Sequence, residues 1–438
     1  MSVQWIEPTA VWDVRPWGGA MFRVADVNGD GKPEVLFLQS AGAHANEAFD
    51  PRYPELDYYK TGVEDQELFC LTLVDGSGDI LWQTGTPWAE DRPFSWNGHW
   101  GRFCDLVDLD GDGKTEILLV HKDELRVYDA TDGHLKNTRK LPNSGFNYTR
   151  AVRIDDSGQY HVFTKSGTSS REHSYGNPTL MLNHRLETVW TKQVEGAGHQ
   201  GNFADVDCDG FDELLIGYSL FDHDGTPIWS HAPLSEDDHL DDSEIVDLDG
   251  DGEFEIAVAH DGHDAYIHNA DGSIRRRISM HHCQNVMSGK FVDAVDGKQL
   301  LFVDRQVATG TRDAVLVDAQ GNELSRHATL GYCEPVAWPS GVGPVSLIRV
   351  ERPPAPDGVH RVRWVDPHGR ELGRFRVRDS FEDHILRHGL DRVSYDRCTY
   401  HGAMHSPAVG DIDGDGHPEL LVTDRETVWV FDVDPARR

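Results

Sequence analysis

Short apolar segments recur along the chain and are separated by turns rich in Gly, Asp and Asn. One group of such segments comprises Phe103–Val107, Ile117–His121, Glu124–Tyr128 and His134–Lys140. Their β-branched and aromatic residues predict strands, and the Gly-containing turn after Thr131 predicts a hairpin between the last two. Four strands in roughly 40 to 50 residues are typical of a propeller blade. The pattern therefore predicts an all-β fold, a β-propeller of four-stranded blades.

An acidic loop recurs five times between the first two strands of a unit. Oxygen-bearing side chains occupy its positions 1, 3, 5 and 9, and Gly occupies position 6 in every copy. The oxygen-bearing residues are Asp26, Asn28, Asp30 and Glu34; Asp108, Asp110, Asp112 and Glu116; Asp205, Asp207, Asp209 and Glu213; Asp247, Asp249, Asp251 and Glu255; and Asp411, Asp413, Asp415 and Glu419. This spacing suits a hard cation, so we expect structural Ca²⁺ at the loops. An EF-hand is excluded, because its last carboxylate stands at position 12 and helices flank it.

The acidic loops and the turns divide the chain into eight units. Three units lack the acidic loop: Tyr148–Lys192, Met287–Ala328 and Tyr332–Val377. We therefore expect eight blades, with seven as the alternative, in a single domain that spans residues 1–438. The last unit, His401–Val433, lacks an outer strand. We expect the N-terminal segment Val3–Ile6 to close this blade, because a closed ring leaves no sheet edge exposed.

The formal net charge is −34, and no basic stripe offsets it. Nucleic acid is therefore excluded as a partner, since binding would require cations that release the counterions of the phosphates. An acidic oligosaccharide would need a local cationic pocket, to which the 24 histidines could contribute. No apolar stretch of about 18 residues predicts a membrane span. The composition leaves the oligomeric state open.

The six cysteines are scattered along the chain without a CxxC pair. This pattern is typical of reduced thiols rather than of a disulfide framework. The first residues, Met1–Glu7, contain neither a basic nor an apolar signal-peptide region. Both features predict a cytoplasmic protein, or a secreted one if a leader has been removed.

Long insertions identify the face of the ring on which a ligand would bind. They fall at the turns opposite the acidic loops: Ala41–Gln66, Thr84–Gly98, Ser166–Asn177, Arg305–Arg312 and Asp379–Tyr400. Insertions that collect on one face of a repeat protein usually build its binding surface. We therefore expect the acidic loops to be structural and the functional site to lie on the other face.

Histidines and other polar residues gather at that same face. Residues that precede the first strands or end the second strands should surround the mouth of the central channel: Trp17, Asn97, His99, Trp100, His121, Tyr148, Lys165, His199, Gln200, His239, His281, His282, Cys333, His401 and His405. Clustered titratable groups in a cavity usually mark a site. The alternative is that each histidine satisfies a buried turn by hydrogen bonding.

Individual pairs in this set support more than one interpretation. His99 and His121 belong to one blade and could act as general base and carboxylate partner, or simply bond each other or the backbone. Tyr148 and Lys165 hold the equivalent positions in the next blade. They could exchange a proton with a sugar hydroxyl, or be a core tyrosine and an exposed lysine.

The cysteines and aromatic residues are also ambiguous. Zn²⁺ could be ligated by a set from neighbouring units: Cys283, Cys333, Cys398, His282 and His401. Their spacing is not a finger pattern, so buried free thiols are the simpler interpretation. Several aromatic residues could stack on sugar rings or fill a propeller core: Trp17, Trp96, Trp100 and Tyr175.

The repeated strand–loop–strand unit resembles the FG-GAP type of propeller repeat. Two runs on the other face, Asn97-Gly-His99-Trp100-Gly and Gly198-His199-Gln200-Gly, resemble the β-propeller polysaccharide lyases: ulvan, rhamnosyl-glucuronate and rhamnogalacturonan lyases. The histidine pattern is similar to the seven-bladed groups, whereas eight units match the rhamnogalacturonan lyases.

The resemblance implies β-elimination at a uronic acid within an acidic oligosaccharide. It implies that His121, with Lys165 or Arg171, neutralises the sugar carboxylate, because the matching basic residue of the family is usually an arginine. His99 would transfer the proton at the adjacent carbon and Tyr148 would act as acid or base. Sugar binding would fall to Trp100, His199, Gln200 and His239. The alternatives are a glycoside hydrolase that removes terminal rhamnose and a non-catalytic, calcium-stabilised carbohydrate-binding propeller.

Overall fold

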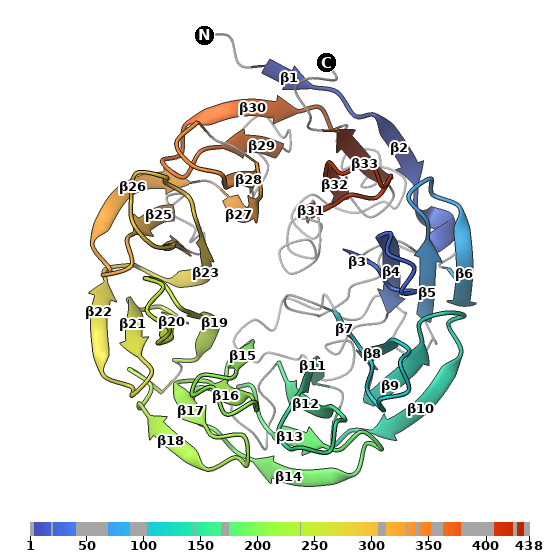
Figure 1. Cartoon of the computed structure of the whole chain (residues 1–438), viewed down its shortest axis with the longest axis horizontal. Coiled ribbons are helices and arrows are strands. Elements are labelled where there is room, and N and C mark those ends of the chain that lie inside the picture. Colours follow the sequence, from blue (N-terminus) through green and yellow to red (C-terminus); the bar gives the residue numbers. More distant parts are fainter. Residues whose placement is uncertain are drawn as a thin grey trace, which may run out of the picture.

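The computed structural model describes most of the predicted units. The described residues are 4–18, 21–40, 69–87, 103–143, 145–167, 175–236, 238–304, 312–329, 331–338, 341–351, 362–377, 407–423 and 427–432. These residues form eight sheets arranged in a closed ring (Figure 1). Eight blades are therefore confirmed, and the alternative of seven is wrong.

Each blade in the first half of the ring consists of four consecutive strands, numbered outward from the channel. They are β3 (Met21–Ala25), β4 (Glu34–Ser40), β5 (Phe69–Val74) and β6 (Ile80–Gly85) in blade one; β7 (Cys104–Val107), β8 (Glu116–His121), β9 (Glu124–Asp129) and β10 (Leu135–Lys140) in blade two; β11 (Phe146–Val152), β12 (His161–Ser166), β13 (Thr179–Leu182) and β14 (Thr188–Lys192) in blade three; and β15 (Gly201–Ala204), β16 (Glu213–Ile216), β17 (Ser219–Phe221) and β18 (Pro227–Ser230) in blade four.

The second half repeats the plan, except where the ends of the chain meet. The strands are β19 (Leu240–Val246), β20 (Glu255–His260), β21 (Ala265–Asn269) and β22 (Ile274–Ile278) in blade five; β23 (Cys283–Gly289), β24 (Gln299–Asp304), β25 (Arg312–Val317) and β26 (Glu323–Thr329) in blade six; β27 (Gly331–Val336), β28 (Ser346–Glu351), β29 (Val362–Val365), β30 (Glu371–Phe375) and β1 (Gln4–Ile6) in blade seven; and β31 (Pro407–Gly410), β32 (Glu419–Thr423), β33 (Thr427–Asp432) and β2 (Ala10–Asp13) in blade eight. One short 3₁₀ helix, η1 (Arg15–Trp17), follows β2.

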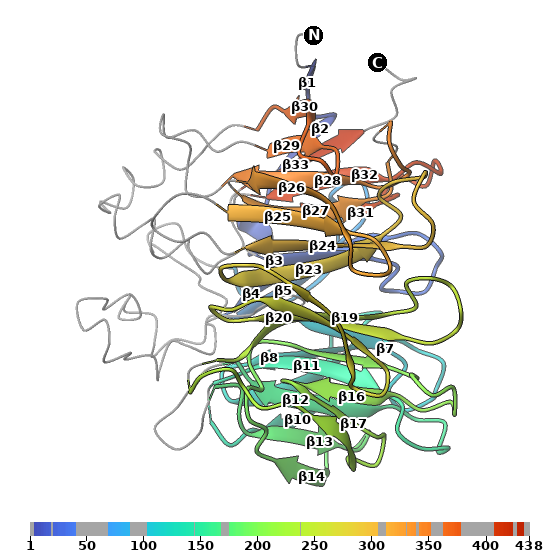
Figure 2. The ribbon, with the colours of Figure 1, turned by 90° about the vertical axis from the view of Figure 1, so that its left-hand side faces the viewer.

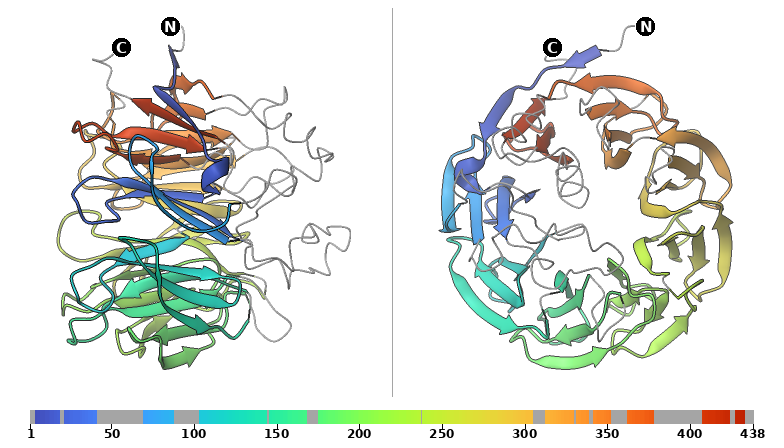
Figure 3. Two further views of the ribbon diagram at one scale, coloured as in Figure 1. Left: turned by 90° about the vertical axis from the view of Figure 1, so that its right-hand side faces the viewer. Right: turned by 180° about the vertical axis from the view of Figure 1, so that it is seen from behind.

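The N-terminal segment closes the ring differently from our prediction. The outer strand of blade eight is β2, which pairs antiparallel with β33, whereas β1 pairs in parallel with β30 of blade seven (Figure 3). The assignment of Val3–Ile6 to the last blade is therefore wrong. Both segments are short edge strands with at least half of their residues exposed, so their apolar pattern could not decide between them. The segment closer in sequence to blade one closes blade eight.

The hydrophobic core is a ring of contacts between neighbouring blades. Each of eight buried clusters among the described residues joins two adjacent blades. One of them packs Leu38 and Leu71 of blade one against Ile117 and Leu119 of blade two. Second strands such as β8 are buried along their whole length, which explains their continuous apolar sequence. Outer strands such as β10 are mostly exposed.

The strands run between the two faces of the ring, so their turns gather on those faces (Figure 2). All five acidic loops connect a first strand to a second strand and therefore share one face. The turns that precede the first strands lie on the opposite face. Most of the predicted insertions, including Ala41–Gln66 and Asp379–Tyr400, lie largely outside the described residues. Within the described residues, no helix is long and apolar enough to cross a membrane.

Candidate active site

A tight turn before β15 presents His199 on the face opposite the acidic loops. The His199 amide donates to the Leu240 carbonyl oxygen at 2.8 Å, and the Leu240 amide donates to the Gly196 carbonyl oxygen at 3.0 Å. Gly198 has a φ of +60°, and a Cβ atom there would lie 1.9 Å from the Leu240 oxygen. Because only glycine fits so close a backbone approach, the sequence Gly198-His199 fixes the imidazole beside the start of β19.

A β-bulge at the start of β19 presents Asp241 at the same place. The register of β19 against β20 skips Asp241, which has no cross-strand partner. A bulge re-aims a side chain and is frequent next to active sites. The following residue, Asp242, faces blade six instead, where its Oδ2 accepts the Val286 amide at 3.1 Å. The bulge therefore separates two adjacent carboxylates and directs only Asp241 towards His199.

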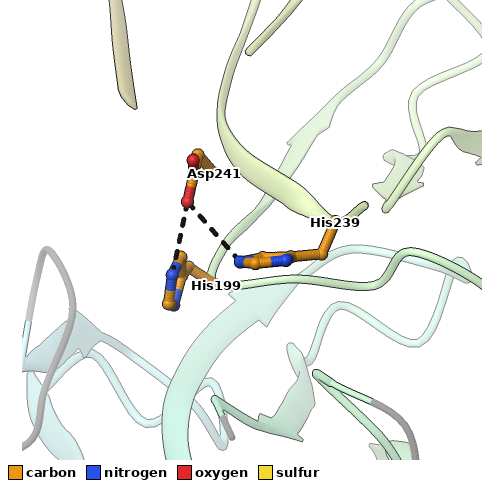
Figure 4. A group of neighbouring side chains, drawn as sticks. All are labelled: His199, His239 and Asp241. Carbon is orange, nitrogen blue, oxygen red and sulfur yellow. Dashed lines mark ion pairs between the residues drawn. The ribbon is translucent and has the colours of Figure 1, made fainter. Parts of the chain in front are cut away.

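Three histidines from three blades surround the Asp241 carboxylate. Nε2 of His199, from blade four, lies 3.3 Å from Asp241 Oδ1, and Nε2 of His239, from blade five, lies 3.7 Å from it (Figure 4). Nε2 of His282, just before β23 of blade six, lies 3.2 Å from Asp241 Oδ2. Only 1% of the Asp241 side chain is exposed. We call these four residues the Asp241 cluster.

Two further residues orient the Asp241 cluster from its edges. The Tyr175 hydroxyl lies 3.3 Å from Nδ1 of His199, and the Tyr175 ring stacks on His239 with centroids 4.3 Å apart. Asp261 Oδ2 lies 3.3 Å from Nδ1 of His239, and Asp261 Oδ1 lies 2.8 Å from Nε2 of His282. Tyr175 is partly buried, and its hydroxyl lies beside a polar cluster whose rings are held on two sides.

Burial and charge act in opposite directions in the Asp241 cluster. Burial raises the pKa of the Asp241 carboxyl, although His282 and His239 oppose the shift. Burial alone would lower the pKa of His282, but the carboxylates of Asp241 and Asp261 outweigh it and raise that pKa to about 9. The cluster therefore combines a buried carboxyl with a histidine that is cationic at neutral pH.

A second buried network is built around Asp238, the residue before His239. Asp238 Oδ1 accepts the Tyr218 hydroxyl at 2.8 Å, and Asp238 Oδ2 lies 3.1 Å from Nδ1 of His260. The Tyr218 ring stacks on His260 with centroids 3.9 Å apart. Burial would raise the pKa of Asp238, but the hydrogen bonds from His260 and the Leu234 amide hold it below its usual value. This network fixes the residue that directly precedes His239.

Tyr148 and Lys165 are buried and contact the backbone of the turn that carries His199. The Tyr148 hydroxyl donates to the Gly201 carbonyl oxygen at 2.6 Å, and the Lys165 ammonium donates to the Gly198 carbonyl oxygen. Their exposed fractions are 2% and 0%. Burial lowers the pKa of Lys165 to about 7. Their predicted roles in proton transfer and carboxylate binding stay predictions, whereas their contacts hold both sides of the turn that carries His199.

Lys165→Met should change how stability depends on pH. The pKa of Lys165 is about 7 in the folded protein and about 10.4 in an unfolded chain. Between these values the unfolded state binds the additional proton, so the free energy of unfolding of the wild type should rise with pH, by up to about 1.4 kcal/mol per pH unit. Below about pH 7 both states hold the proton and this contribution is constant.

Urea unfolding of wild type and variant across this pH range would measure the effect. The Lys165→Met variant should lose the rise with pH, because it lacks the titrating group. The matched control is Lys140→Met, since that side chain is 67% exposed and paired with Asp123. Parallel pH profiles for wild type and Lys165→Met would contradict the lowered pKa of the buried Lys165 amine.

The remaining predicted residues are distributed differently. His121 is buried in blade two, where its Nδ1 lies 2.7 Å from the Ser40 hydroxyl and its ring packs edge-on against Phe69. Gln200 is half-buried in the turn beside His199, and Trp17 packs in the core between blades eight and one. Several candidates lie outside the described residues: Trp96, Asn97, His99, Trp100, Arg171, Cys398, His401 and His405.

The predicted cysteine–histidine zinc set stays a prediction, because Cys398 and His401 lie outside the described residues. The Cys283 thiol is buried and donates to the Asn285 carbonyl oxygen at 3.6 Å. Burial raises the pKa of Cys283 well above its usual value, which disfavours the thiolate that binds Zn²⁺. His282 faces Asp241 and Asp261 instead. Cys70, Cys104, Cys208 and Cys283 are free thiols.

Sequence reasoning missed the acidic members of the site. Asp238 and Asp241 lie on either side of His239 at the very start of a first strand, and Asp261 follows His260 at the end of the second strand. These are the positions that predicted the histidines, so the same rule could have included their acidic neighbours. The bulge that re-aims Asp241 has no comparable signal in the sequence.

The five acidic loops share one hydrogen-bond pattern. In each loop the aspartate at position 1 accepts the amide of the glycine at position 6, and the glutamate at position 9 accepts the amide at position 2. Each of these glutamates is buried. Burial raises the pKa of Glu213 and of Glu419 to about 7. The arrangement brings several carboxylates together, which requires a compensating charge.

The loops differ in how that charge is compensated. Lys136 pairs with Asp110 and Glu116 in the second loop, and Arg275 pairs with Glu255 in the fourth. In the third loop, Oδ1 of Asp205 and Oε1 of Glu213 are buried without a hydrogen-bond partner in the described part of the chain. These orphaned oxygens fit a bound cation, and the side chains present have the oxygen chemistry that Ca²⁺ requires.

Comparison with known proteins supports the predicted resemblance in sequence. The FG-GAP repeat family matches residues 405–431. Over 257 residues the chain is 24% identical to the rhamnogalacturonan exolyase YesX of Bacillus subtilis (strain 168). The match covers 47% of this chain and 39% of that protein, so the chain spans well under two thirds of the relative.

Solved structures share the fold over most of the chain. The match to the crystal structure of the exotype rhamnogalacturonan lyase YesX spans 94% of this chain and 72% of that chain, with a TM-score of 0.55 and 15% identity. The match to the Bacillus licheniformis rhamnogalacturonan lyase PL11 spans 94% of this chain and 71% of that chain, with a TM-score of 0.58 and 15% identity. The match to the V. cholerae biofilm matrix protein Bap1 spans 99% of this chain and 91% of that chain, with a TM-score of 0.56 and 12% identity. The predicted resemblance to β-propeller polysaccharide lyases is thus confirmed in sequence and in fold.

Proposed function

We propose that the protein is a polysaccharide lyase that cleaves a uronic-acid-containing, rhamnose-linked oligosaccharide by β-elimination. The observation that carries the proposal is the Asp241 cluster beside the hydroxyl of the partly buried Tyr175, on the face opposite the acidic loops. The similarity to rhamnogalacturonan lyases supports the reaction class. Clustered, perturbed titratable groups support a reaction centre at this position.

The chemistry of β-elimination makes three demands on such a site. The sugar carboxylate must be neutralised, the proton on the adjacent carbon must be removed, and the leaving oxygen must receive a proton. Neutralisation stabilises the enolate-like transition state and is typically the largest electrostatic contribution. A positioned acid or base contributes typically about 10²–10⁴-fold more.

We assign these demands to two parts of the site. The Asp241 cluster, with its three imidazole rings, forms the polar centre that meets the sugar carboxylate. The Tyr175 hydroxyl, adjacent to Nδ1 of His199, transfers a proton to or from the sugar. Tyr148 and Lys165 act as positioning residues, because they hold the His199 turn from its buried side.

An ultraviolet assay with uronate-containing oligosaccharides tests the proposal. β-Elimination leaves a carbon–carbon double bond conjugated to the sugar carboxylate, so absorbance should rise as the substrate is cleaved. A glycoside hydrolase would release reducing ends without this absorbance, and a carbohydrate-binding propeller would give neither signal. Either of these results across a panel of uronate–rhamnose oligosaccharides would overturn the lyase assignment.

We further propose that the acidic loops bind structural Ca²⁺. The orphaned oxygens of Asp205 and Glu213 favour a cation in the third loop. In the second and fourth loops Ca²⁺ must compete with Lys136 and Arg275. The five loops should therefore bind Ca²⁺ with different affinities, the third more tightly than the second.

Removal of Ca²⁺ should lower the melting temperature, and its addition should restore it. An ion that binds only the folded state stabilises it by about 2.7 kcal/mol per site at 100 times its dissociation constant. Glu213→Gln should lose part of this stabilisation, whereas Lys136→Met should gain Ca²⁺ affinity because it frees Asp110 and Glu116. Calorimetric titration and thermal melting measure both effects. A melting temperature that EDTA and Ca²⁺ leave unchanged would contradict the calcium proposal.

A further inference from the structure

The geometry points to a site for one divalent first-row transition-metal ion in the Asp241 cluster. Its ligands are the Asp241 carboxylate and the Nε2 atoms of His199, His239 and His282. Blades four, five and six contribute one imidazole each, so the site forms only where these three blades pack side by side. It is distinct in place and in chemistry from the acidic loops on the other face.

The first argument is the spacing of the candidate ligand atoms. Two ligands that each lie about 2.0–2.1 Å from a tetrahedral ion are about 3.3 Å apart. The three imidazole nitrogens lie 3.3, 3.7 and 3.2 Å from the nearest Asp241 oxygen. Within the triad of His199, His239 and Asp241, all ligand atoms lie within 4.8 Å of one another.

The second argument is the environment of the other ring nitrogens. A histidine that ligates a metal usually directs its second nitrogen to a carboxylate, a carbonyl or another oxygen, which fixes the ring. Nδ1 of His199 faces the Tyr175 hydroxyl at 3.3 Å, and Nδ1 of His239 faces Asp261 Oδ2 at 3.3 Å. Both rings are therefore oriented with Nε2 turned towards Asp241.

The third argument is an unsatisfied buried carboxylate oxygen. Asp241 Oδ2 is buried and lacks a well-aligned hydrogen bond among the described residues, although Nε2 of His282 lies 3.2 Å away. An unsatisfied buried carboxylate oxygen is costly and requires an explanation. An ion shared by this oxygen and Nε2 of His282, which also lies 2.8 Å from Asp261 Oδ1, would satisfy it.

The ligand chemistry selects the class of metal. Imidazole nitrogens suit the borderline transition ions, whereas Ca²⁺ and Mg²⁺ require mostly oxygen. Three imidazoles and one carboxylate therefore exclude the Ca²⁺ that the acidic loops favour. If the proposed lyase function holds, the bound ion would supply the positive charge that meets the sugar carboxylate. The binding proposal itself does not depend on that reaction.

Titration with Co²⁺ in the presence of excess Ca²⁺ tests the site. Ca²⁺ occupies oxygen-rich sites, and the visible absorption of Co²⁺ reports nitrogen ligation. The wild type should bind one equivalent of Co²⁺ that Zn²⁺ displaces, and His239→Ala and His282→Ala should each lower the affinity at least about tenfold. The matched control is His263→Ala, because His263 is half-buried in the same blade and contacts Ser235 rather than the cluster.

Two results would overturn the metal proposal. One is the absence of a saturable equivalent of Co²⁺ in the wild type. The other is an unchanged Co²⁺ affinity in His239→Ala and His282→Ala, with circular dichroism confirming that both variants fold. The outcome is separable from the lyase assay: Co²⁺ binding without an unsaturated product supports the metal site alone, and product formation without Co²⁺ binding supports the lyase alone.

Discussion

Tyr175→Phe should reduce kcat on a uronate-containing oligosaccharide by about 10²–10⁴-fold, the usual contribution of a positioned acid or base. The variant keeps the ring that stacks on His239 and removes only the hydroxyl beside His199. KM should change much less than kcat, because proton transfer acts in the transition state. Steady-state kinetics with the ultraviolet assay provide the measurement.

Tyr148→Phe is the matched control for this result. It also removes a single hydroxyl, but one that is buried and donates to the Gly201 carbonyl oxygen. We expect a loss of about 1 kcal/mol in the free energy of unfolding and a much smaller fall in kcat. If Tyr148→Phe abolishes turnover and Tyr175→Phe does not, the assignment of the two tyrosines is reversed, and the original prediction for Tyr148 holds.

Gly198→Ala should disrupt the site, because the added methyl group has no room beside β19. A Cβ atom at Gly198 would lie 1.9 Å from the Leu240 oxygen, at a φ of +60°. The turn would have to move away from β19, and His199 would separate from Asp241. We expect a loss of about 3–5 kcal/mol in the free energy of unfolding, together with loss of turnover.

Gly158→Ala is the matched control for Gly198→Ala, because it introduces backbone strain without a steric clash. Gly158 has a φ of +77°, but a Cβ atom there meets nothing within 4 Å. Its alanine variant should lose only about 1–2 kcal/mol of stability, the cost of an L-residue in the left-handed region, and should keep its activity. Equal losses of stability in the two variants, measured by denaturant unfolding, would contradict a tight contact between the His199 turn and β19.

The repeated features of the sequence predict the ring well. Each acidic loop and each Gly-containing hairpin marks a fixed point within a blade, so the strands around Cys104–Val107 and Glu116–His121 lie where the apolar pattern predicts them. Closure by Ala10–Asp13 rather than by Gln4–Ile6 depends on which of two similar edge segments reaches blade eight. Local sequence carries no information on that choice.

The site is predicted in its position but not in its detail. His199, His239 and His282 meet because each precedes the first strand of its blade, which the repeat already indicates. Tyr148, Lys165 and His121 were expected at the channel mouth, yet they are buried. Bulges near the starts of β11, β19 and β23 break the alternation of side chains, so strand periodicity cannot tell which residue faces the site.

A crystal structure with a bound uronate-containing product would test the central claim most directly. Our account predicts that the sugar carboxylate lies against the Asp241 cluster, with the Tyr175 hydroxyl within hydrogen-bond distance of the sugar. The acidic loops should hold only cations. A product bound elsewhere on the ring, with no sugar atom near Tyr175 or His239, would contradict the account.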